Sequence, residues 1–171
     1  QVNYEKLRAR LLADKQVLAW TGPQSAAGPA GKLIAPQSLP GIVLDDADAK
    51  RTGHWSESAS IAWRVGRGYL HDSNTGKGEA TAVFTPNLPM AGDYEIILLN
   101  VPNANRASNV PVTVSVAGQS VKSLKVNQKS LGEISLGKYK LPAGTLTTVT
   151  VSNQDTDGHV ILDGVQFKPV R

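Results

Sequence analysis

The stretch Asn100-Val-Pro-Asn-Ala-Asn-Arg-Ala-Ser-Asn-Val-Pro-Val-Thr-Val-Ser-Val116 joins a polar loop to an alternating strand. Valine occupies every second position from residue 112 to residue 116, with Thr113 and Ser115 between, which is the period of a half-buried strand. The segment before the loop, residues 93–100, is strongly apolar and predicts another strand. Because the loop concentrates Asn and Arg, the stretch predicts a hydrogen-bonding surface at one end of a β-sheet.

Similar strand-like segments recur from Gly41 onward, and clusters of Gly, Pro, Asn and Asp separate them. The predicted strands cover residues 42–45, 54–64, 79–85, 93–100, 110–116, 120–126, 132–141, 146–152 and 159–168. The pair Asp157-Gly158 predicts a hairpin turn between the last two of them. About nine short strands and no second helix predict an all-β fold, an antiparallel β-sandwich or jelly roll.

The first part of the chain has a different pattern. Residues 3–18 predict one N-terminal helix, because they carry an apolar stripe at helical spacing, formed by Tyr4, Leu7, Leu11 and Leu18. We therefore expect a helix and a Gly/Pro-rich linker in residues 1–40 and the β-sandwich domain in residues 41–171. An isolated helix of this length is marginal in water, so the stripe is expected to pack against the sandwich or against an upstream part of a longer protein.

Composition excludes several classes of function. The chain has no cysteine, which excludes disulfides, thiol nucleophiles and zinc–cysteine sites. The formal net charge of +4 favours anionic partners such as an anionic polysaccharide, but its Lys and Arg residues are scattered, so we expect no nucleic-acid partner. No apolar run approaches the roughly 20 residues that span a bilayer, so we expect no membrane insertion. The chain starts at Gln1 without a leader, which predicts a fragment or mature product of a longer protein.

Several segments, in order, carry a resemblance to one known family. They include Gly41-Ile-Val-Leu-Asp-Asp-Ala-Asp-Ala49, Gly66-Arg-Gly-Tyr69, Phe84-Thr-Pro-Asn-Leu-Pro-Met-Ala-Gly-Asp-Tyr-Glu95, Asn105-Arg-Ala-Ser-Asn-Val-Pro-Val-Thr-Val114 and Val160-Ile-Leu-Asp-Gly-Val-Gln-Phe167. Over residues 41–169 the chain resembles the golvesin carboxy-terminal-like domain, a module of secreted bacterial proteins that include ones labelled xanthan lyase. The resemblance implies a β-sandwich, an extracellular or periplasmic location, and a fold-level likeness to carbohydrate-binding modules.

The N-terminal segment carries a second resemblance. Residues 4–14 and 16–20 are similar to the segment that joins such a module to a FAD-dependent oxidoreductase. No Gly-x-Gly-x-x-Gly motif follows a strand here, so a flavin or nicotinamide would bind upstream and we expect no such cofactor in this chain. The parent protein is then expected to be an oxidoreductase or a polysaccharide lyase, and its upstream catalytic domain is an expected partner.

Residues with catalytic chemistry are present but are not arranged in a catalytic motif. His54, His71 and His159 lack the spacing of metal ligands, and no Gly-x-Ser-x-Gly nucleophile motif occurs. His71 and Asp72 are neighbours, but adjacent residues on a strand point to opposite faces. We therefore predict no catalytic residue and interpret this chain as not an enzyme by itself.

The acidic residues suggest a structural calcium ion. Leu44-Asp-Asp-Ala-Asp48 together with Leu162-Asp-Gly164 is similar to the calcium-binding strand ends of many sugar-binding sandwiches. Asp46, Asp48 and Asp163 are the candidate ligands, because calcium takes about six to eight oxygen ligands. The alternative is that these carboxylates only accept hydrogen bonds from backbone amides.

The opening loop supplies the polar candidates for ligand binding. Arg106 can bind a carboxylate or two hydroxyl groups at once, and the carboxamides of Asn105 and Asn109 can both donate and accept. His71 is a further polar candidate near this surface. The alternative is that Arg106 ties its loop to the end of a sheet or pairs with an acid such as Asp72.

Aromatic side chains are scarce, so each is a candidate for stacking on a sugar ring. Trp55 and Tyr69 are the candidates for the ligand site, and we expect Tyr69 to be partly exposed because Gly66-Arg-Gly68 is typical of a loop. The alternative is that Trp55 and Trp63 belong to the core.

These features favour a non-catalytic accessory module of a larger exported protein that binds polysaccharide or cell-surface glycan. The alternative is a structural domain that packs against its own upstream catalytic domain.

Overall fold

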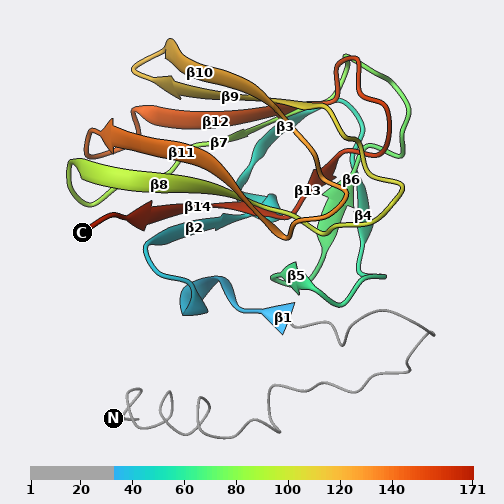
Figure 1. Ribbon diagram of the computed structural model, residues 1–171, viewed down its shortest axis with the longest axis horizontal. Helices are drawn as coiled ribbons and strands as arrows, with labels where there is room; N and C mark the ends of the chain where they lie inside the picture. The colour runs from blue at the N-terminus through green and yellow to red at the C-terminus, as the bar shows by residue number, and fades with distance from the viewer. Residues whose placement is uncertain (1–32) are drawn as a thin grey trace, which may run out of the picture.

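The computed structural model describes residues 33–171, and two antiparallel sheets form its body (Figure 1). The five-stranded sheet has the order β10 (Gln119–Val126), β9 (Val110–Val116), β12 (Thr147–Ser152), β7 (Thr81–Phe84) and β3 (Lys50–Thr52). The four-stranded sheet has the order β11 (Glu133–Leu141), β8 (Gly92–Leu99), β14 (Gly164–Pro169) and β2 (Ile42–Asp45).

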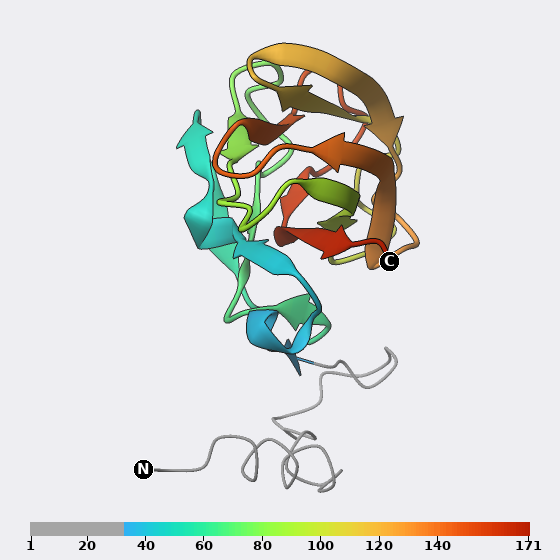
Figure 2. The same ribbon diagram turned by 90° about the vertical axis from the view of Figure 1, so that its left-hand side faces the viewer.

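Two smaller sheets lie beside this body (Figures 1 and 2). The three-stranded sheet has the order β13 (Ile161–Leu162), β6 (Tyr69–His71) and β4 (Ser56–Ser58). The fourth sheet is a parallel pair of β1 (Leu33–Ile34) with β5 (Arg64–Val65). The short 3-10 turns η1 (Pro36–Ser38) and η2 (Asp46–Asp48) flank β2 in the sequence.

The core forms because the apolar faces of the two main sheets meet. Along β9, Val110, Val112 and Val114 are buried, while the residues between them are half-buried, as the alternation predicts. They share one core cluster with Ile96 and Leu98 of β8 and with buried side chains of β12 and β14. The fold is therefore the antiparallel β-sandwich that the sequence predicts.

Strand β8 is buried on both faces. Ile96 and Leu98 enter the shared core, whereas Ile97 and Leu99 face a second cluster that contains Val65. This explains why residues 96–99 are an unbroken apolar run rather than an alternating one. Ile34 and Leu39, which the sequence assigns to the linker, pack against this second cluster.

The strand count differs from the prediction, because the described residues form fourteen strand segments rather than nine. The predicted strand at 54–64 is wrong: it contains β4 and the first residue of β5, and these two strands belong to different sheets. Between them the chain leaves the ladder, and the Arg64 Nη1 donates to the carbonyls of Ala59 and Ile61 at 3.3 and 2.7 Å. Strands β1, β3 and β6 have no counterpart in the prediction.

The predicted strand at 159–168 divides into two at Asp163, where the chain passes from the three-stranded to the four-stranded sheet. Both carboxylate oxygens of Asp163 accept from the backbone N–H of Val65, at 2.9 and 3.1 Å, which fixes this residue between the sheets. The predicted hairpin at Asp157-Gly158 is also wrong. Strand β12 pairs with β7 and β9, whereas β13 pairs with β6.

The predicted N-terminal helix at residues 3–18 lies outside the described residues. Across residues 33–171 we find no helix with the length and apolarity needed to cross a bilayer.

Candidate functional site

Three loops and the small sheet meet at one end of the sandwich, which we call the loop end: residues 53–58, 69–80, 100–109 and 153–160. Backbone hydrogen bonds join the loops: Ala107 N–H donates to the His159 carbonyl at 2.8 Å, and His159 N–H donates to the Asn105 carbonyl at 3.1 Å. Asp72 N–H donates to the Val160 carbonyl at 3.2 Å. The loop end therefore contains all six candidate ligand-binding residues, with Tyr69 on β6 and Trp55 directly before β4.

Arg106 lies beneath this surface, with 5% of its side chain exposed. Its Nε donates to the Val101 carbonyl at 3.0 Å and its Nη1 donates to Asn105 Oδ1 at 2.9 Å. Its Nη2 is buried and has no hydrogen-bond partner among the described residues. Pairing with Asp72, one of the predicted alternatives, is wrong, because Asp72 forms its ion pair with Lys77.

Tyr69 is 3% exposed, so the expectation of a partly exposed ring is wrong. It lies on β6, which is hydrogen-bonded to β4 on one side and to β13 on the other, and the Arg106 Cζ lies 5.5 Å from its ring centre. Its hydroxyl contacts the Ser58 and Ser60 hydroxyls at 3.1 and 2.9 Å. Burial opposes ionisation, but these hydrogen bonds and Arg106 hold the pKa of Tyr69 below its usual value. Tyr69 supports the guanidinium rather than offering a ring to solvent.

Asn105 and Asn109 have different environments. Asn105 is exposed, and its carboxamide covers the Arg106 guanidinium. Asn109 is half-buried and binds the neighbouring loop twice, donating to the Asp155 carbonyl at 2.9 Å and accepting from Asp157 N–H at 3.0 Å. Asn109 therefore holds two loops together, and Asn105 presents a polar group to solvent.

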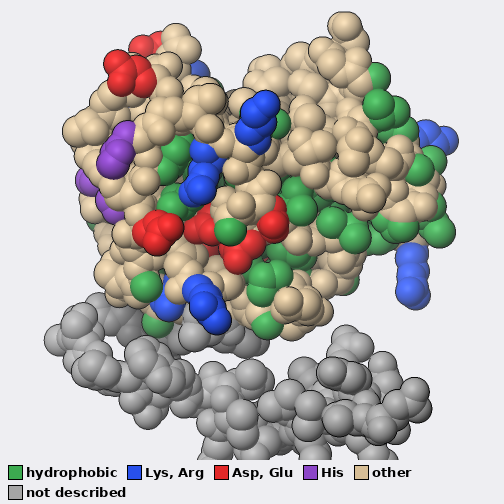
Figure 3. Space-filling view, turned by 180° about the vertical axis from the view of Figure 1, so that it is seen from behind, with side chains coloured by type: hydrophobic (Ala, Val, Ile, Leu, Met, Phe, Trp, Pro, Cys, Tyr) green, Lys and Arg blue, Asp and Glu red, His purple; other side chains and the backbone are tan. Residues whose placement is uncertain are grey.

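The three histidines of the chain gather at the loop end, which the sequence did not predict; Figure 3 shows His side chains together at one edge of the molecule. His54 Nε2 lies 2.8 Å from Ser56 Oγ, which lies 3.0 Å from Ser73 Oγ. Ser73 N–H donates to His71 Nδ1 at 3.1 Å, and the His71 and His159 ring centres are 6.0 Å apart. Burial and the neighbouring His159 lower the pKa of His71, so its ring is neutral at pH 7.

The two tryptophans contact the body of the domain. Trp55 is half-buried, packs against the main core, and donates from Nε1 to the Thr52 carbonyl at 3.0 Å. The Trp63 ring lies directly against Gly132, where an added Cβ would come within 1.9 Å of ring atoms. Trp55 retains an accessible part next to His54 and Ser56, whereas Trp63 has a packing role.

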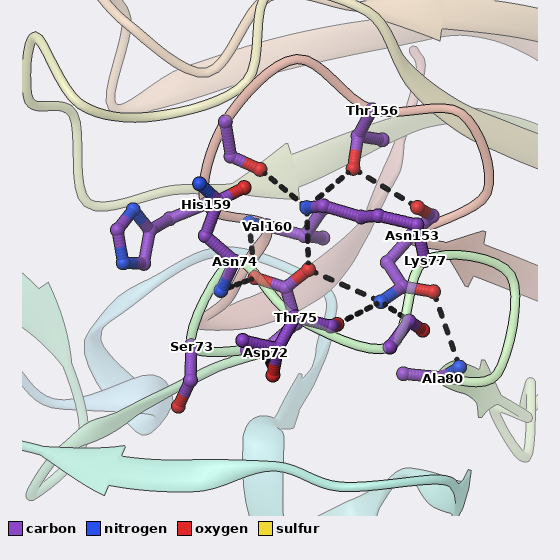
Figure 4. Close-up of polar contacts among 12 residues, drawn as sticks. Asp72, Ser73, Asn74, Thr75, Lys77, Ala80, Asn153, Thr156, His159 and Val160 are labelled. Carbon is purple, nitrogen blue, oxygen red and sulfur yellow. Dashed lines mark hydrogen bonds and ion pairs between the residues drawn. The ribbon is translucent and has the colours of Figure 1, made fainter.

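Within the loop end lies a buried polar network that could not be predicted from the sequence (Figure 4). Asp72 is 1% exposed and forms an ion pair of 2.9 Å with Lys77, which also donates to Thr156 Oγ1 at 2.8 Å. The Asp72 carboxylate also accepts from three further groups, namely the backbone N–H groups of Asn74 and Val160 and the Asn153 side chain, at 2.9, 2.9 and 3.1 Å. Burial opposes ionisation, but these bonds together lower the pKa of Asp72. The network fixes the relative positions of the loops that carry His71 and His159.

The predicted calcium ligands lie away from this network, at β2 and at the start of β14. Burial, and then the charges of Asp45 and Asp46, raise the pKa of Asp163 to about 8; burial and Asp45 raise that of Asp46 to about 6. The Asp48 carboxylate accepts from the Asp45 N–H at 2.8 Å, as the alternative interpretation expects. Residues 33–171 contain no group of three or more His, Asp or Glu side chains arranged to hold a metal ion. Acidic side chains do gather on one face of the molecule (Figure 3). Calcium binding stays a prediction.

Comparison with known proteins finds similar chains. Xanthan lyase from Bacillus sp. (strain GL1) is 39% identical in an alignment of 140 residues that covers 77% of this chain and 15% of that protein. The structure of Paenibacillus xanthan lyase is 34% identical with a TM-score of 0.71, over 75% of this chain and 13% of that one. This chain therefore spans only a small fraction of the length of these relatives.

A family 35 carbohydrate binding module from Clostridium thermocellum shares the fold, with a TM-score of 0.56 and 16% identity. The match covers 75% of this chain and 98% of that module, so the shared fold can exist as a separate domain. Residues 42–169 match the Golvesin C-terminal domain family. On this match, which agrees with the resemblance in its sequence motifs, the chain belongs to the Golvesin C-terminal domain family.

Proposed function

We propose that this domain is a non-catalytic module that binds polysaccharide or cell-surface glycan through its loop end. The observation that carries the proposal is a group of polar side chains from the four segments of the loop end, all exposed or half-buried beside the Asp72 network: His54, His71, Asn105 and His159. Sugar hydroxyl groups need donors and acceptors in fixed positions, and this group offers both. The shared fold with a carbohydrate binding module supports the proposal.

The similarity to xanthan lyases supports a larger parent protein. We infer that the parent is exported, to the cell exterior or the periplasm, and carries an upstream catalytic domain of the lyase or FAD-dependent oxidoreductase class. In such a protein the module would raise the concentration of the catalytic domain at its polysaccharide by tethering it there.

Affinity electrophoresis of the 171-residue chain tests the proposal, with neutral and acidic polysaccharides cast in the gel and calcium present. We expect at least one polysaccharide to retard migration, and His159→Ala to reduce the retardation by about tenfold. Gln119→Ala is the matched control, because Gln119 is exposed and follows the end of β9 opposite to the 100–109 loop. If no polysaccharide retards the chain, the proposal is wrong and a structural role against an upstream domain becomes the better interpretation.

A further inference from the structure

Arg106 is a buried cation whose charge no carboxylate balances among the described residues. Arg106 is 5% exposed, the ion pair of the loop end joins Lys77 to Asp72, and the Arg106 Nη2 has no hydrogen-bond partner among the described residues. A buried charge and a buried unpaired donor are both costly, so native proteins usually pair them. Arg106 therefore points to a partner that binds from outside the domain.

The surroundings of Arg106 select the charge of that partner. Tyr69 lies against the guanidinium, and Arg106 acts electrostatically on His71, which lies 6.0 Å from His159 between ring centres. None of the acids of the loop end forms an ion pair with Arg106 among the described residues: Asp72 accepts from Lys77 and from backbone N–H groups, and Asp157 accepts from the Ser108 N–H. This part of the loop end therefore favours an anion.

Among the described residues, the Arg106 guanidinium makes one hydrogen bond to another side chain, that of Asn105. Nη1 donates to Asn105 Oδ1 at 2.9 Å, and Asn105 is exposed on a loop. Within residues 33–171 the Asn105 side chain makes no other hydrogen bond. Rotation of this side chain would uncover the guanidinium edge at little cost, because a single neutral hydrogen bond contributes only about 1 kcal/mol.

We propose that Arg106 binds the carboxylate of an acidic sugar, which replaces the Asn105 carboxamide and accepts hydrogen bonds from Nη1 and Nη2, with His71 and His159 beside the sugar. The inference rests on the proposed function and names its substrate class. A carboxylate matches the planar guanidinium in two places, and such charge-assisted bonds are roughly twice as strong as the neutral bond that they replace.

The experiment compares sodium glucuronate, the simplest way to place a carboxylate on a glucose ring, with glucose and with sodium acetate. Isothermal titration of the full chain at constant ionic strength measures each affinity. We expect glucuronate to bind at least about tenfold more tightly than either glucose or acetate, since neither offers both the ring and the charge.

Asn105→Asp is the most direct test of the proposed binding position, because it places a fixed carboxylate where the ligand carboxylate is proposed to bind. We expect it to weaken glucuronate binding at least about tenfold and to raise the melting temperature. Gln119→Glu carries the same change in charge at the opposite end of β9 and should do neither. Arg106→Lys, which keeps the charge but loses the planar fork, should also weaken glucuronate binding.

Each outcome has one meaning. Equal affinity for glucuronate and glucose overturns the inference but leaves glycan binding in place. Acetate binding as tightly as glucuronate also overturns it, because the site would then be a simple anion site. A lower melting temperature for Asn105→Asp contradicts the unpaired-cation argument, and failure of all three probes together with all polysaccharides overturns both proposals.

Discussion

Asp72 and Asp163 are both buried, with 1% and 0% exposed, yet their environments have opposite effects on the carboxylate. Asp72 at the loop end accepts from the Lys77 ammonium, from two backbone N–H groups and from Asn153, and its pKa is lowered. Asp163, between β13 and β14, accepts from the Val65 N–H alone among residues 33–171, and its pKa is raised to about 8.

The difference shows that hydrogen-bond donors and a cation can outweigh the effect of burial on a carboxylate of this domain. Burial acts against ionisation at both positions, but only Asp72 has enough donors to overcome it. The loop end therefore contains a charged, rigid network at neutral pH, whereas Asp163 is protonated and neutral there. Four experiments test this contrast.

The largest effect is expected from Asp72→Asn. The carboxamide would turn an N–H donor toward Lys77 or Asn153 and leave the ammonium unpaired, so the free energy of unfolding should fall by about 3 kcal/mol. Asp163→Asn is the matched control, and it should not lower the free energy of unfolding at pH 7, because it removes the cost of keeping Asp163 protonated in the folded state while the unfolded chain ionises it. Urea unfolding measures both, and equal effects would contradict the contrast.

Calcium is expected to have the next largest effect. If Asp46, Asp48 and Asp163 bind the ion, calcium at about 100 times its dissociation constant should stabilise the domain by about 2.7 kcal/mol. Thermal unfolding with calcium and with a chelator measures this, and magnesium controls for charge alone. Asp163→Asn should abolish the effect of calcium, and Asp72→Asn should retain it. If calcium leaves the melting temperature of the unsubstituted chain unchanged, the calcium prediction is wrong.

The pH dependence of stability should differ between the two aspartates. Asp163 has a folded pKa of about 8, above its usual 3.8, so stability should be lost as pH rises toward that value, by at least about 1 kcal/mol between pH 5 and pH 9 in chelator. Asp163→Asn should flatten this part of the profile. The Asp72 contribution has the opposite sign, because its lowered pKa stabilises the fold above the usual value and is lost in acid. If the stability of the unsubstituted chain does not change between pH 5 and pH 9, the pKa of Asp163 is not raised.

The smallest effect is expected from Thr156→Val. Thr156 Oγ1 accepts from Lys77 at 2.8 Å and donates to the Asn153 carbonyl at 2.9 Å, so the change should cost about 1 kcal/mol. Thr113→Val on β9 is the control and should be near neutral, since the Thr113 contact with Ser123 is solvent-exposed. A larger loss at Thr113 would mean that the network contributes little to stability.

The strands of the sandwich could be predicted from sequence because their signal is local. The alternation from Val112 to Val116 and the apolar run before Asn100 each depend only on neighbours in the chain. The division of residues 159–168 could not be predicted, because it depends on a hydrogen bond from Val65, 98 residues away. The boundary between β4 and β5 likewise depends on the backbone carbonyls that Arg64 reaches in the folded state.

The sequence identified several residues of the candidate site but not how they are arranged in space. The sequence singled out Arg106, Asn105 and His71, and these residues do lie at one end of the sandwich. The sequence could not show that Tyr69 is buried against Arg106. The preceding segment, Gly66-Arg-Gly68, is typical of a loop and gives no sign of the short strand β6. The Asp72 network joins residues up to 88 positions apart, so no window of the sequence contains it.

The position of β14 has a consequence for the order in which this domain can fold during synthesis. β14 lies between β8 and β2, and β2 pairs with no other strand of that sheet. A ribosome that has made residues 33–163 has therefore produced a chain in which β2 has no neighbour and one edge of β8 is open. The four-stranded sheet can close only when residues 164–169 leave the exit tunnel, so the domain should acquire its fold late and in one step.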